Sequence, residues 1–533
     1  MIQSKKALKA VLSFTATVAI AFTATISVSS SASAAEFLVK YKNESAVNKI
    51  IAMQTESMGF EVRGLHKPGK LLKVNISGDK KIQARAIAAF YADKNVEYVV
   101  PNFKLHSFSM PVDIKTLKTQ YALTKVNAEQ AWKRAGNKGS KNVLLAVIDT
   151  GVDYKHKNLA PNMVAGFDFR DNDADPMDLT SQQNPGHGTH CAGIVGATGL
   201  IDGGTEGMSP EVSIMPLRFL GADGSGDLDG GVKAIDYAIA HNVQVISASW
   251  GASVPLSTAK PLVEAIARAE QAGIIFVTAA ANDGKNNDVT DVYPANAGTP
   301  NMIIVAASDA NDSKPSWSNY GKAKVSLAAP GDAIISTLPG DKYDNLSGTS
   351  MATPLVAGMV AFLKAQDATL TGAEVRSLLQ TTGAKVNIQT ACNCRVDAMS
   401  AVDTLLSQKA WIVPAAATID VNATLQLAMK NAKGSVTFAV SDANVATINS
   451  SGLLTGIKDG SVTVRATDAA GVSVSSLDIN IGKVSSGGGS TPDPTNPSNP
   501  ANPPGGGGGS CPLGDPSLCQ IFCQIMPTAP FCN

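Results

Sequence analysis

The chain has 533 residues, which is long for one domain and suggests three or four. Its 44 Lys and Arg balance 44 Asp and Glu, so a formal net charge of zero gives no indication of nucleic-acid binding or of an acidic partner. Few aromatic residues and many glycines are typical of a compact α/β protein with tight turns.

Residues 1–34 have the pattern of an export signal. Lys5 and Lys6 precede an apolar stretch over residues 7–28, and Ala32-Ser33-Ala34 fits a small-x-small cleavage site. Because the apolar stretch is long for a signal, an uncleaved membrane anchor is the alternative. The segment predicts a secreted (extracellular) or cell-surface-associated protein.

A small α+β unit is predicted over residues 35–108. Residues 37–41 and 71–76 alternate like strands, whereas residues 46–58 and 82–93 have helical spacing. The segment Val-Glu-Tyr-Val-Val-Pro-Asn at residues 96–102 closes this unit.

Three short segments then offer an acid, a base and a nucleophile. Asp149 ends the apolar run 143–148, His187 opens His-Gly-Thr-His, and Ser350 lies in Gly-Thr-Ser-Met-Ala-Thr-Pro before an apolar helix. A serine hydroxyl needs a neighbouring base to become nucleophilic, and an acid fixes the tautomer of that base. Singly these residues are equally a turn aspartate, a core histidine and a helix cap. The order Asp, His, Ser is that of subtilisin among the known arrangements.

From about Tyr121 to about Leu406 the chain resembles the subtilisin-like serine proteases. The resemblance implies that Asp149, His187 and Ser350 are the catalytic triad and that Asn282 donates to the oxyanion. His190, the second histidine of its motif, is expected to be a structural neighbour.

The same resemblance implies a substrate-binding segment. Ser249, Trp250 and Gly251 would pair with extended substrate, and Ala280 would lie in the pocket. Trp250 would line the specificity pocket, with buried packing as the alternative. Ala281 stands where many relatives have glycine, which keeps a preference for small substrate side chains open.

The predicted fold class is α/β, a subtilisin-like, mostly parallel sheet flanked by helices over residues 109–408. Strands are expected at 143–148, 212–217, 243–247, 273–278 and 302–306, with helices at 228–242 and 259–272. Residues 35–108 resemble the inhibitory prodomain of this family, a transient inhibitor removed by a cut between Lys104 and Thr119. An ordinary N-terminal binding module is the alternative.

An acidic loop precedes His187, with five aspartates between residues 168 and 178. Carboxylate oxygens suit Ca²⁺, and Asp171, Asp173 and Asp175 are the candidate ligands of a structural ion that the chemistry itself does not require. The spacing is not that of an EF-hand, and a solvated acidic turn is the alternative.

The C-terminal third has three further parts. Short alternating runs over residues 415–482 predict a β-sandwich and resemble the bacterial Ig-like (group 2) domains. The resemblance implies surface adhesion or spacing, and the sequence leaves open whether the domain binds a surface ligand. Residues 483–510 form a Gly/Pro/Ser linker. The Cys-rich tail, 511–533, has four cysteines, which imply two disulfides, with zinc as the alternative.

The remaining three cysteines lie in the central region. Cys191, four residues after His187, is expected to be a buried free thiol. Cys392 and Cys394 can form a loop disulfide or pair elsewhere, and the sequence leaves this open.

Together these features predict a secreted serine endopeptidase that hydrolyses protein or peptide substrates through a Ser350 acyl-enzyme and is made as a self-processed precursor. The alternative from another class is a non-enzymatic surface adhesin that uses the protease fold as a scaffold.

Overall fold

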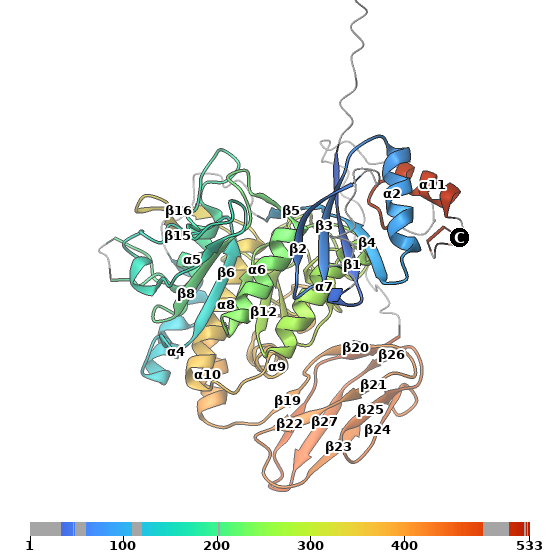
Figure 1. Ribbon diagram of the computed structural model, residues 1–533. Helices are drawn as coiled ribbons and strands as arrows, with labels where there is room; N and C mark the ends of the chain where they lie inside the picture. Colours follow the sequence, from blue (N-terminus) through green and yellow to red (C-terminus); the bar gives the residue numbers. More distant parts are fainter. Residues whose placement is uncertain are drawn as a thin grey trace, which may run out of the picture.

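The computed structural model describes residues 34–45, 47, 60–108, 120–200, 203–482, 511–526, 529 and 531–532. They form an N-terminal domain, a central α/β domain, a β-rich domain and a short tail (Figure 1). Apart from Ala34 and Val47, the predicted export signal, first helix and linker lie outside these ranges. Within them, no helix combines the length and the apolar character needed to cross a lipid bilayer.

The N-terminal domain is a four-stranded antiparallel sheet with one face covered by helix α2, Lys80–Ala92. Its strands, in the spatial order β2-β3-β1-β4, are β1 Ala35–Tyr41, β2 Phe60–His66, β3 Leu71–Ile76 and β4 Val96–Pro101. Along β1 the side chains alternate, so Phe37 and Val39 pack with α2 while Leu38 packs with the central domain. The strands predicted at 37–41 and 71–76 and the helix at 82–93 are confirmed.

A nine-stranded sheet with parallel pairing, except at the edge strand β17, forms the centre of the next domain. Its spatial order is β17-β18-β14-β13-β12-β10-β6-β8-β7. The strands are β6 Leu144–Asp149, β7 Phe167–Asp168, β8 Ser213–Arg218, β10 Val245–Ala248, β12 Ile275–Ala279, β13 Met302–Ser308, β14 Leu327–Pro330, β17 Ala384–Lys385 and β18 Cys394–Arg395. The five predicted strands are therefore confirmed as β6, β8, β10, β12 and β13.

Helices cover both faces of this sheet (Figure 1). They are α3 Tyr121–Lys125, α4 Ala128–Ala135, α5 His187–Gly196, α6 Leu228–Ala240, α7 Leu256–Gln271, α8 Thr349–Gln366, α9 Gly372–Thr382 and α10 Ala398–Leu406. Alternate residues of β6 enter two separate cores: Leu145 and Val147 pack with α5 and α8, whereas Ala146 and Ile148 pack with α6 and α7. A strand buried on both faces explains the uninterrupted apolar run that ends at Asp149.

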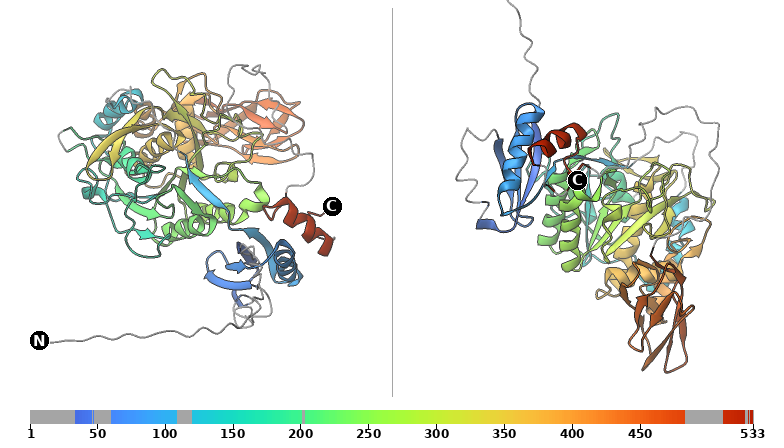
Figure 2. Two further views of the ribbon diagram at one scale, coloured as in Figure 1. Left: turned by 90° about the horizontal axis from the view of Figure 1, so that it is seen from above. Right: turned by 90° about the vertical axis from the view of Figure 1, so that its right-hand side faces the viewer.

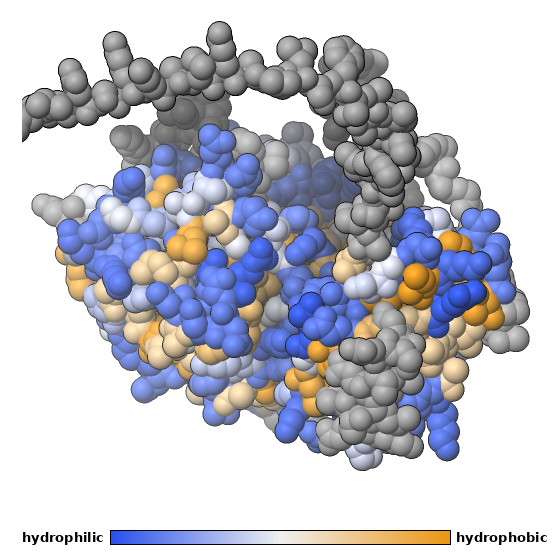
Figure 3. Space-filling model, turned by 45° about the horizontal axis from the view of Figure 1, so that its top comes forward, coloured by the Kyte–Doolittle hydropathy of each residue, from blue (hydrophilic) through white to orange (hydrophobic). Residues whose placement is uncertain are grey.

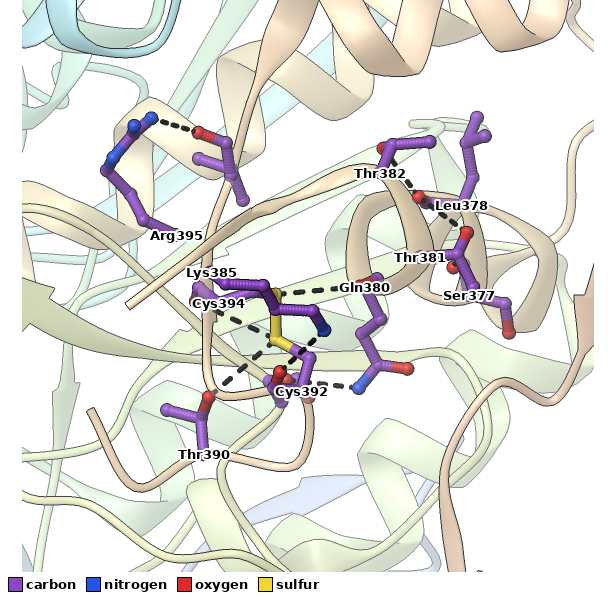
Figure 4. Close-up of a disulfide and its surroundings, with 12 residues drawn as sticks. Ser377, Leu378, Gln380, Thr381, Thr382, Lys385, Thr390, Cys392, Cys394 and Arg395 are labelled. Atoms are coloured by element: carbon purple, nitrogen blue, oxygen red, sulfur yellow. Dashed lines mark hydrogen bonds between the residues drawn. A yellow bond between two sulfur atoms is a disulfide. The ribbon is translucent and has the colours of Figure 1, made fainter. Parts of the chain in front are cut away.

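Cys392 and Cys394 form a disulfide with each other beside β18, in a loop shown in Figure 4. The ammonium of Lys385 donates to the Cys392 carbonyl oxygen at 3.2 Å. The pairing that the sequence left open is therefore local, and Cys191 is a buried free thiol as expected.

The β-rich domain consists of short strands around a small apolar core that contains Ile412, Leu427, Leu454, Val464 and Ile479. Its strands are β19 Trp411–Val413, β20 Ala417–Ile419, β21 Thr424–Gln426, β22 Ala428–Lys430, β23 Val436–Val440, β24 Ala446–Ile448, β25 Leu453–Gly456, β26 Gly460–Val462, β27 Val464–Asp468, β28 Ser473–Ser475 and β29 Ile479–Ile481. The domain lies beside α9, where Lys430 pairs with Glu374 at 2.7 Å.

The described part of the tail contains one helix, α11 Pro516–Ile525, held by the disulfides Cys511–Cys519 and Cys523–Cys532. Two disulfides are as predicted, and the zinc alternative is wrong because all four thiols are paired. Helix α11 lies against α2 of the N-terminal domain, as Figure 1 and Figure 2 both show. On the described part of the face in Figure 3, hydrophilic and apolar residues are interspersed.

Candidate active site

Asp149 and His187 meet where β6 ends and α5 begins. His187 Nδ1 lies 2.7 Å from Asp149 Oδ1, and both side chains are buried. Since a carboxylate only accepts, Nδ1 carries the proton in the neutral imidazole, and Nε2 then has the lone pair. Burial opposes the charged imidazole, but the Asp149 carboxylate outweighs it and raises the pKa of His187 well above its usual value.

Ser350 lies in the first turn of α8, where the exposed amides of a helix N-terminus favour negative charge. Its Oγ donates to the Ser249 carbonyl oxygen at 3.0 Å. His187 Nε2 is buried and has no hydrogen-bond partner among the described residues. The serine hydroxyl is therefore oriented away from the free lone pair of the histidine.

Asn282 follows β12 and faces the start of α8. Its Oδ1 accepts from the backbone N–H of Thr349 at 3.0 Å and from the Thr349 hydroxyl at 2.9 Å. These two donors fix the orientation of the amide, so Nδ2 points the other way. There Nδ2 donates to the carbonyl oxygen of Phe108 at 2.8 Å.

Phe108 belongs to a segment of the N-terminal domain that lies across this site. Strand β5, Lys104–Ser107, is inserted antiparallel between β9, Ser225–Asp227, and β11, Trp250–Gly251. The Phe108 N–H donates to the Ser249 carbonyl oxygen at 3.1 Å. The Phe108 carbonyl group is thus held next to Asn282, and the Phe108 N–H shares the Ser249 carbonyl oxygen with the Ser350 hydroxyl.

Gly348 leaves the space that this arrangement needs. A Cβ atom added at Gly348 would lie 2.5 Å from the Phe108 carbonyl oxygen and 3.1 Å from Asn282 Nδ2. Only glycine allows the carbonyl group to approach the amide donor so closely.

Comparisons with known proteins identify the family. The sequence profile of the subtilase family matches residues 140–404, and that of the bacterial Ig-like domain (group 2) matches residues 404–478. The chain is 40% identical over 268 residues to thermitase of Thermoactinomyces vulgaris, an alignment that covers 50% of this chain and 89% of thermitase. It is 39% identical over 292 residues to the thermophilic serine proteinase of Bacillus sp. (strain AK1), covering 55% of this chain and 68% of that protein. Subtilisin E of Bacillus subtilis (strain 168) is 33% identical over 302 residues, 56% of this chain and 74% of subtilisin E. The chain belongs to the subtilase family. It is a subtilisin-like serine endopeptidase with an Ig-like domain after the protease domain.

In this subtilase the predicted segment Ser249-Trp250-Gly251 contacts the inserted strand through its backbone. Trp250 is paired with Ser107 and Gly251 with His106. A Cβ atom added at Gly251 would lie 2.8 Å from Phe108 Cζ, so the phenyl ring lies directly against this glycine.

The Trp250 side chain has a different place from the one the resemblance implied. It is fully buried, stacks edge-on with Phe219 at 4.8 Å between ring centroids, and donates from its indole nitrogen to the Ile148 carbonyl oxygen at 2.7 Å. The indole ring of Trp250 is therefore packed in the core, as the alternative prediction for this residue had it.

Trp250 also lines a pocket for Leu105, which holds the buried side chain of that residue. A Cβ atom added at Gly231 would lie 3.2 Å from Leu105 Cδ1, 3.4 Å from Phe219 Cε2 and 3.7 Å from Trp250 Cη2. These three side chains therefore surround one point, three residues before Phe108 in the strand. The sequence analysis missed this pocket because its walls come from separate elements.

Ala280 and Ala281 are buried at the end of β12, in the apolar cluster against which Phe108 packs. Ala281 has φ 89°, a left-handed conformation that costs a non-glycine residue about 1–2 kcal/mol. Phe108 packs against the same apolar cluster, so a phenyl ring and the Ala281 methyl group are both accommodated there.

Two further residues, missed by the sequence analysis, position Asp149 and His187. The buried carboxylate of Asp178 accepts from Thr150 Oγ1 at 2.9 Å, from Thr189 N at 2.9 Å and from Thr189 Oγ1 at 2.7 Å, and so joins the loop after Asp149 to helix α5. Burial, partly offset by these bonds, raises the pKa of Asp178 to about 6. Asn184 Oδ1 accepts from the His187 N–H at 2.8 Å. The sequence could have pointed to Asp178 and Asn184 through their position just before the motif that begins at His187.

His190 and Cys191 are buried in the same helix as His187. His190 Nε2 lies 3.1 Å from the Asp344 carbonyl oxygen, and burial lowers the pKa of this imidazole to about 3. Cys191 Sγ lies 4.0 Å from His187 Nδ1 and donates to the Ser350 carbonyl oxygen at 3.5 Å. Burial raises the pKa of this thiol, which keeps it protonated and unreactive.

The three predicted calcium ligands are not brought together. Asp171 pairs with Arg218 at 2.6 Å, Asp173 accepts from the Asp175 N–H at 2.9 Å, and Asp175 accepts from the Tyr154 hydroxyl at 3.0 Å. Among the described residues, the only cluster of His, Cys and acidic groups close enough for a common ion is Asp149, His187 and Cys191. In this arrangement Asp171, Asp173 and Asp175 each have a separate hydrogen-bond donor and do not form a common cluster.

Proposed function

We propose that this subtilase is a secreted serine endopeptidase made as a precursor that cuts itself between Phe108 and Ser109. The observation that carries the proposal is the pair of hydrogen bonds at Phe108: its carbonyl oxygen accepts from Asn282 Nδ2 at 2.8 Å, and its N–H donates to the Ser249 carbonyl oxygen at 3.1 Å. These bonds hold the residue as the acyl part of a scissile peptide. Residues 35–108 then act as an inhibitory prodomain whose last strand occupies the cleft.

The reaction begins when the Ser350 hydroxyl turns from the Ser249 carbonyl oxygen toward His187 Nε2. His187 takes the hydroxyl proton as Oγ bonds to the Phe108 carbonyl carbon, and the imidazolium formed is stabilised by Asp149. The oxygen that gains negative charge already accepts from Asn282, so the donor needs little rearrangement.

The tetrahedral intermediate collapses when the bond to the Ser109 nitrogen breaks and His187 protonates that amine. Water, deprotonated by the same histidine, then hydrolyses the Ser350 ester and leaves Phe108 with a free carboxylate. The strand pairing of β5 with β9 and β11 does not depend on this bond, so the cleaved prodomain still blocks the cleft.

External substrates would bind as β5 does, as an extended strand between β9 and β11 with an aromatic side chain at the position of Phe108 and an aliphatic one at that of Leu105. This deduction uses the burial of Leu105 and the contact of Phe108 with Gly251. The proposal includes export directed by residues 1–34 and a surface ligand for the Ig-like domain.

Mass spectrometry of the precursor and its products tests the cut. We expect a new N-terminus at Ser109 in the parent chain, no cut in Ser350→Ala, and a normal cut in Ser313→Ala, an exposed serine of the same domain. A fluorophosphonate probe should label the parent and not Ser350→Ala. Unchanged processing and labelling of Ser350→Ala would reject the mechanism in favour of the adhesin alternative.

A structural calcium ion stays a prediction, separate from the chemistry. If one is bound, removing calcium with a chelator should lower Tm and leave kcat at lower temperature unchanged. An unchanged Tm after chelation would reject it.

A further inference from the structure

The C-terminal tail shares one apolar core with the prodomain, although the two are far apart in sequence. Leu513, Leu518 and Phe522 of the tail are 2%, 2% and 0% exposed. They belong to the same cluster as Phe37 of β1 and Ile87 of α2. The tail therefore completes the core of the prodomain.

Aromatic and charged contacts border this shared core. The ring of Tyr91 on α2 lies 5.5 Å from that of Phe522 and 6.2 Å from that of Phe531. At the beginning of the two helices, Lys80 pairs with Asp515 at 2.8 Å and also donates to the Ser517 hydroxyl. The contact thus combines buried aromatic anchors with a charged rim, as specific interfaces do.

The described tail is too short to fold around a core of its own. Segments below about 40 residues usually need cross-links or a partner, and this one has both: two disulfides and the surface of α2. The tail lies away from the cleft, and Thr258 on α7 donates to the Pro512 carbonyl oxygen at 3.5 Å. It thus contacts both the prodomain and the protease domain.

The connectivity of the chain gives this contact a consequence. After a cut at Phe108 the prodomain is no longer covalently attached, whereas the tail stays joined to the protease through residues 109–510. We propose that the tail is a clamp that binds the cleaved prodomain and retains it on the enzyme, so that inhibition outlasts cleavage until the tail lets go or is removed. This inference rests on the proposed self-processing.

Two linked contacts explain why retention would be strong. The prodomain contacts the protease through β5 and through ion pairs with α6 and α7, such as Lys40 with Glu264 at 2.7 Å. Because the tail belongs to the same chain as the protease, its contact is intramolecular, and the prodomain leaves only when both contacts open together.

The test measures the delay between the cut and the onset of activity in the full-length precursor. Cleavage at Phe108 is followed by mass spectrometry, and activity by a fluorogenic peptide with phenylalanine before the cut bond. We expect Phe522→Ala to cut at the parent rate and to shorten the delay at least about tenfold. Gln524→Ala, an exposed position of the same helix, should match the parent.

A charge reversal on the prodomain side tests the same contact without emptying the core. Lys80→Glu should shorten the delay because it faces Asp515, which stays in place as the cap of α11, whereas Lys80→Arg keeps the positive charge and should match the parent. An unchanged delay in Lys80→Glu counts against the contact.

Severing the chain after folding avoids any effect on folding. A recognition site for a specific protease is placed within residues 483–510, and the already processed complex is then cut there. Faster release of the prodomain supports the clamp, and unchanged release overturns it. If the parent itself is never cut at Phe108, the proposed function fails instead, so the two failures are distinguishable.

Discussion

Removing the side-chain amide of Asn282 is expected to slow peptide-bond cleavage while leaving substrate binding almost unchanged. Asn282 Nδ2 is 2.8 Å from the Phe108 carbonyl oxygen, the atom that gains negative charge in the transition state. An interaction that strengthens as charge develops contributes to kcat more than to KM.

The expected size follows from the number of donors lost. Asn282→Ala removes one charge-stabilising donor, which costs roughly 2.7–4 kcal/mol and lowers kcat about 10²- to 10³-fold. The other anchors of the substrate strand remain: the Phe108 N–H to Ser249, the pairing with β9 and β11, and the buried Leu105. KM should therefore change by less than about threefold.

The variant also removes the oxygen that accepts from Thr349, so a second variant is needed. Asn282→Asp keeps an acceptor for Thr349 N and Oγ1 but has no donor, and its charge repels the oxyanion. It should be at least as slow as Asn282→Ala. Asp283→Ala, exposed in the same loop, is the matched control.

Steady-state kinetics on the mature enzyme, with a peptide of the sequence of residues 104–110, decide the matter. A loss of less than about tenfold in kcat for Asn282→Ala, or a loss carried by KM, would refute the assigned role. Recovery of activity in Asn282→Asp would assign the loss to the disturbed contact with Thr349 instead.

Three further predictions follow from the same geometry. Because Asp149 raises the pKa of His187 and the base acts when neutral, kcat should rise with pH through a value above the ordinary histidine pKa, and Asp149→Asn should move this acidic limb to lower pH; a limb that does not move contradicts the assignment. Since Leu105 is fully buried, replacing leucine by alanine at that position of the peptide substrate should lower kcat/KM by roughly 30-fold. Replacing histidine by alanine at the exposed position of His106 should have little effect. Equal effects at the two positions would exclude the pocket for Leu105. Burial raises the pKa of Asp178 to about 6, so the stability that its protonated form contributes is present below the ordinary carboxyl pKa and is lost as pH rises through about 6. Tm should therefore fall with pH in this range, and Asp178→Asn should remove the fall. An unchanged fall in Asp178→Asn would show that another group titrates.

The catalytic chemistry and the main sheet were predictable because they are encoded locally. The apolar run that ends at Asp149 predicts a strand buried on both faces, and the motifs around His187 and Ser350 are short and ordered along the chain. The sequence placed the cut that removes the predicted prodomain only between Lys104 and Thr119.

Other features were decided by contacts between distant segments. Trp250 lies in the segment predicted to bind substrate. Only its packing on Phe219 and its hydrogen bond to the Ile148 carbonyl oxygen show that the indole ring belongs to the core, where it also lines the pocket for Leu105. The aspartates before His187 predict a cation site from the sequence. The ion pair between Asp171 and Arg218, which lies on the separate strand β8, appears only in the tertiary structure.

The sequence by itself determined the candidate catalytic residues, the fold class and the cysteine-rich character of the tail, because each depends on residue type, periodicity or spacing within one segment. Only the tertiary structure decided which carbonyl group accepts from Asn282, how the tail cysteines are paired and that the tail packs on α2. These facts depend on apolar surfaces and hydrogen-bonding groups that come together from opposite ends of the chain, and no local pattern records such a meeting.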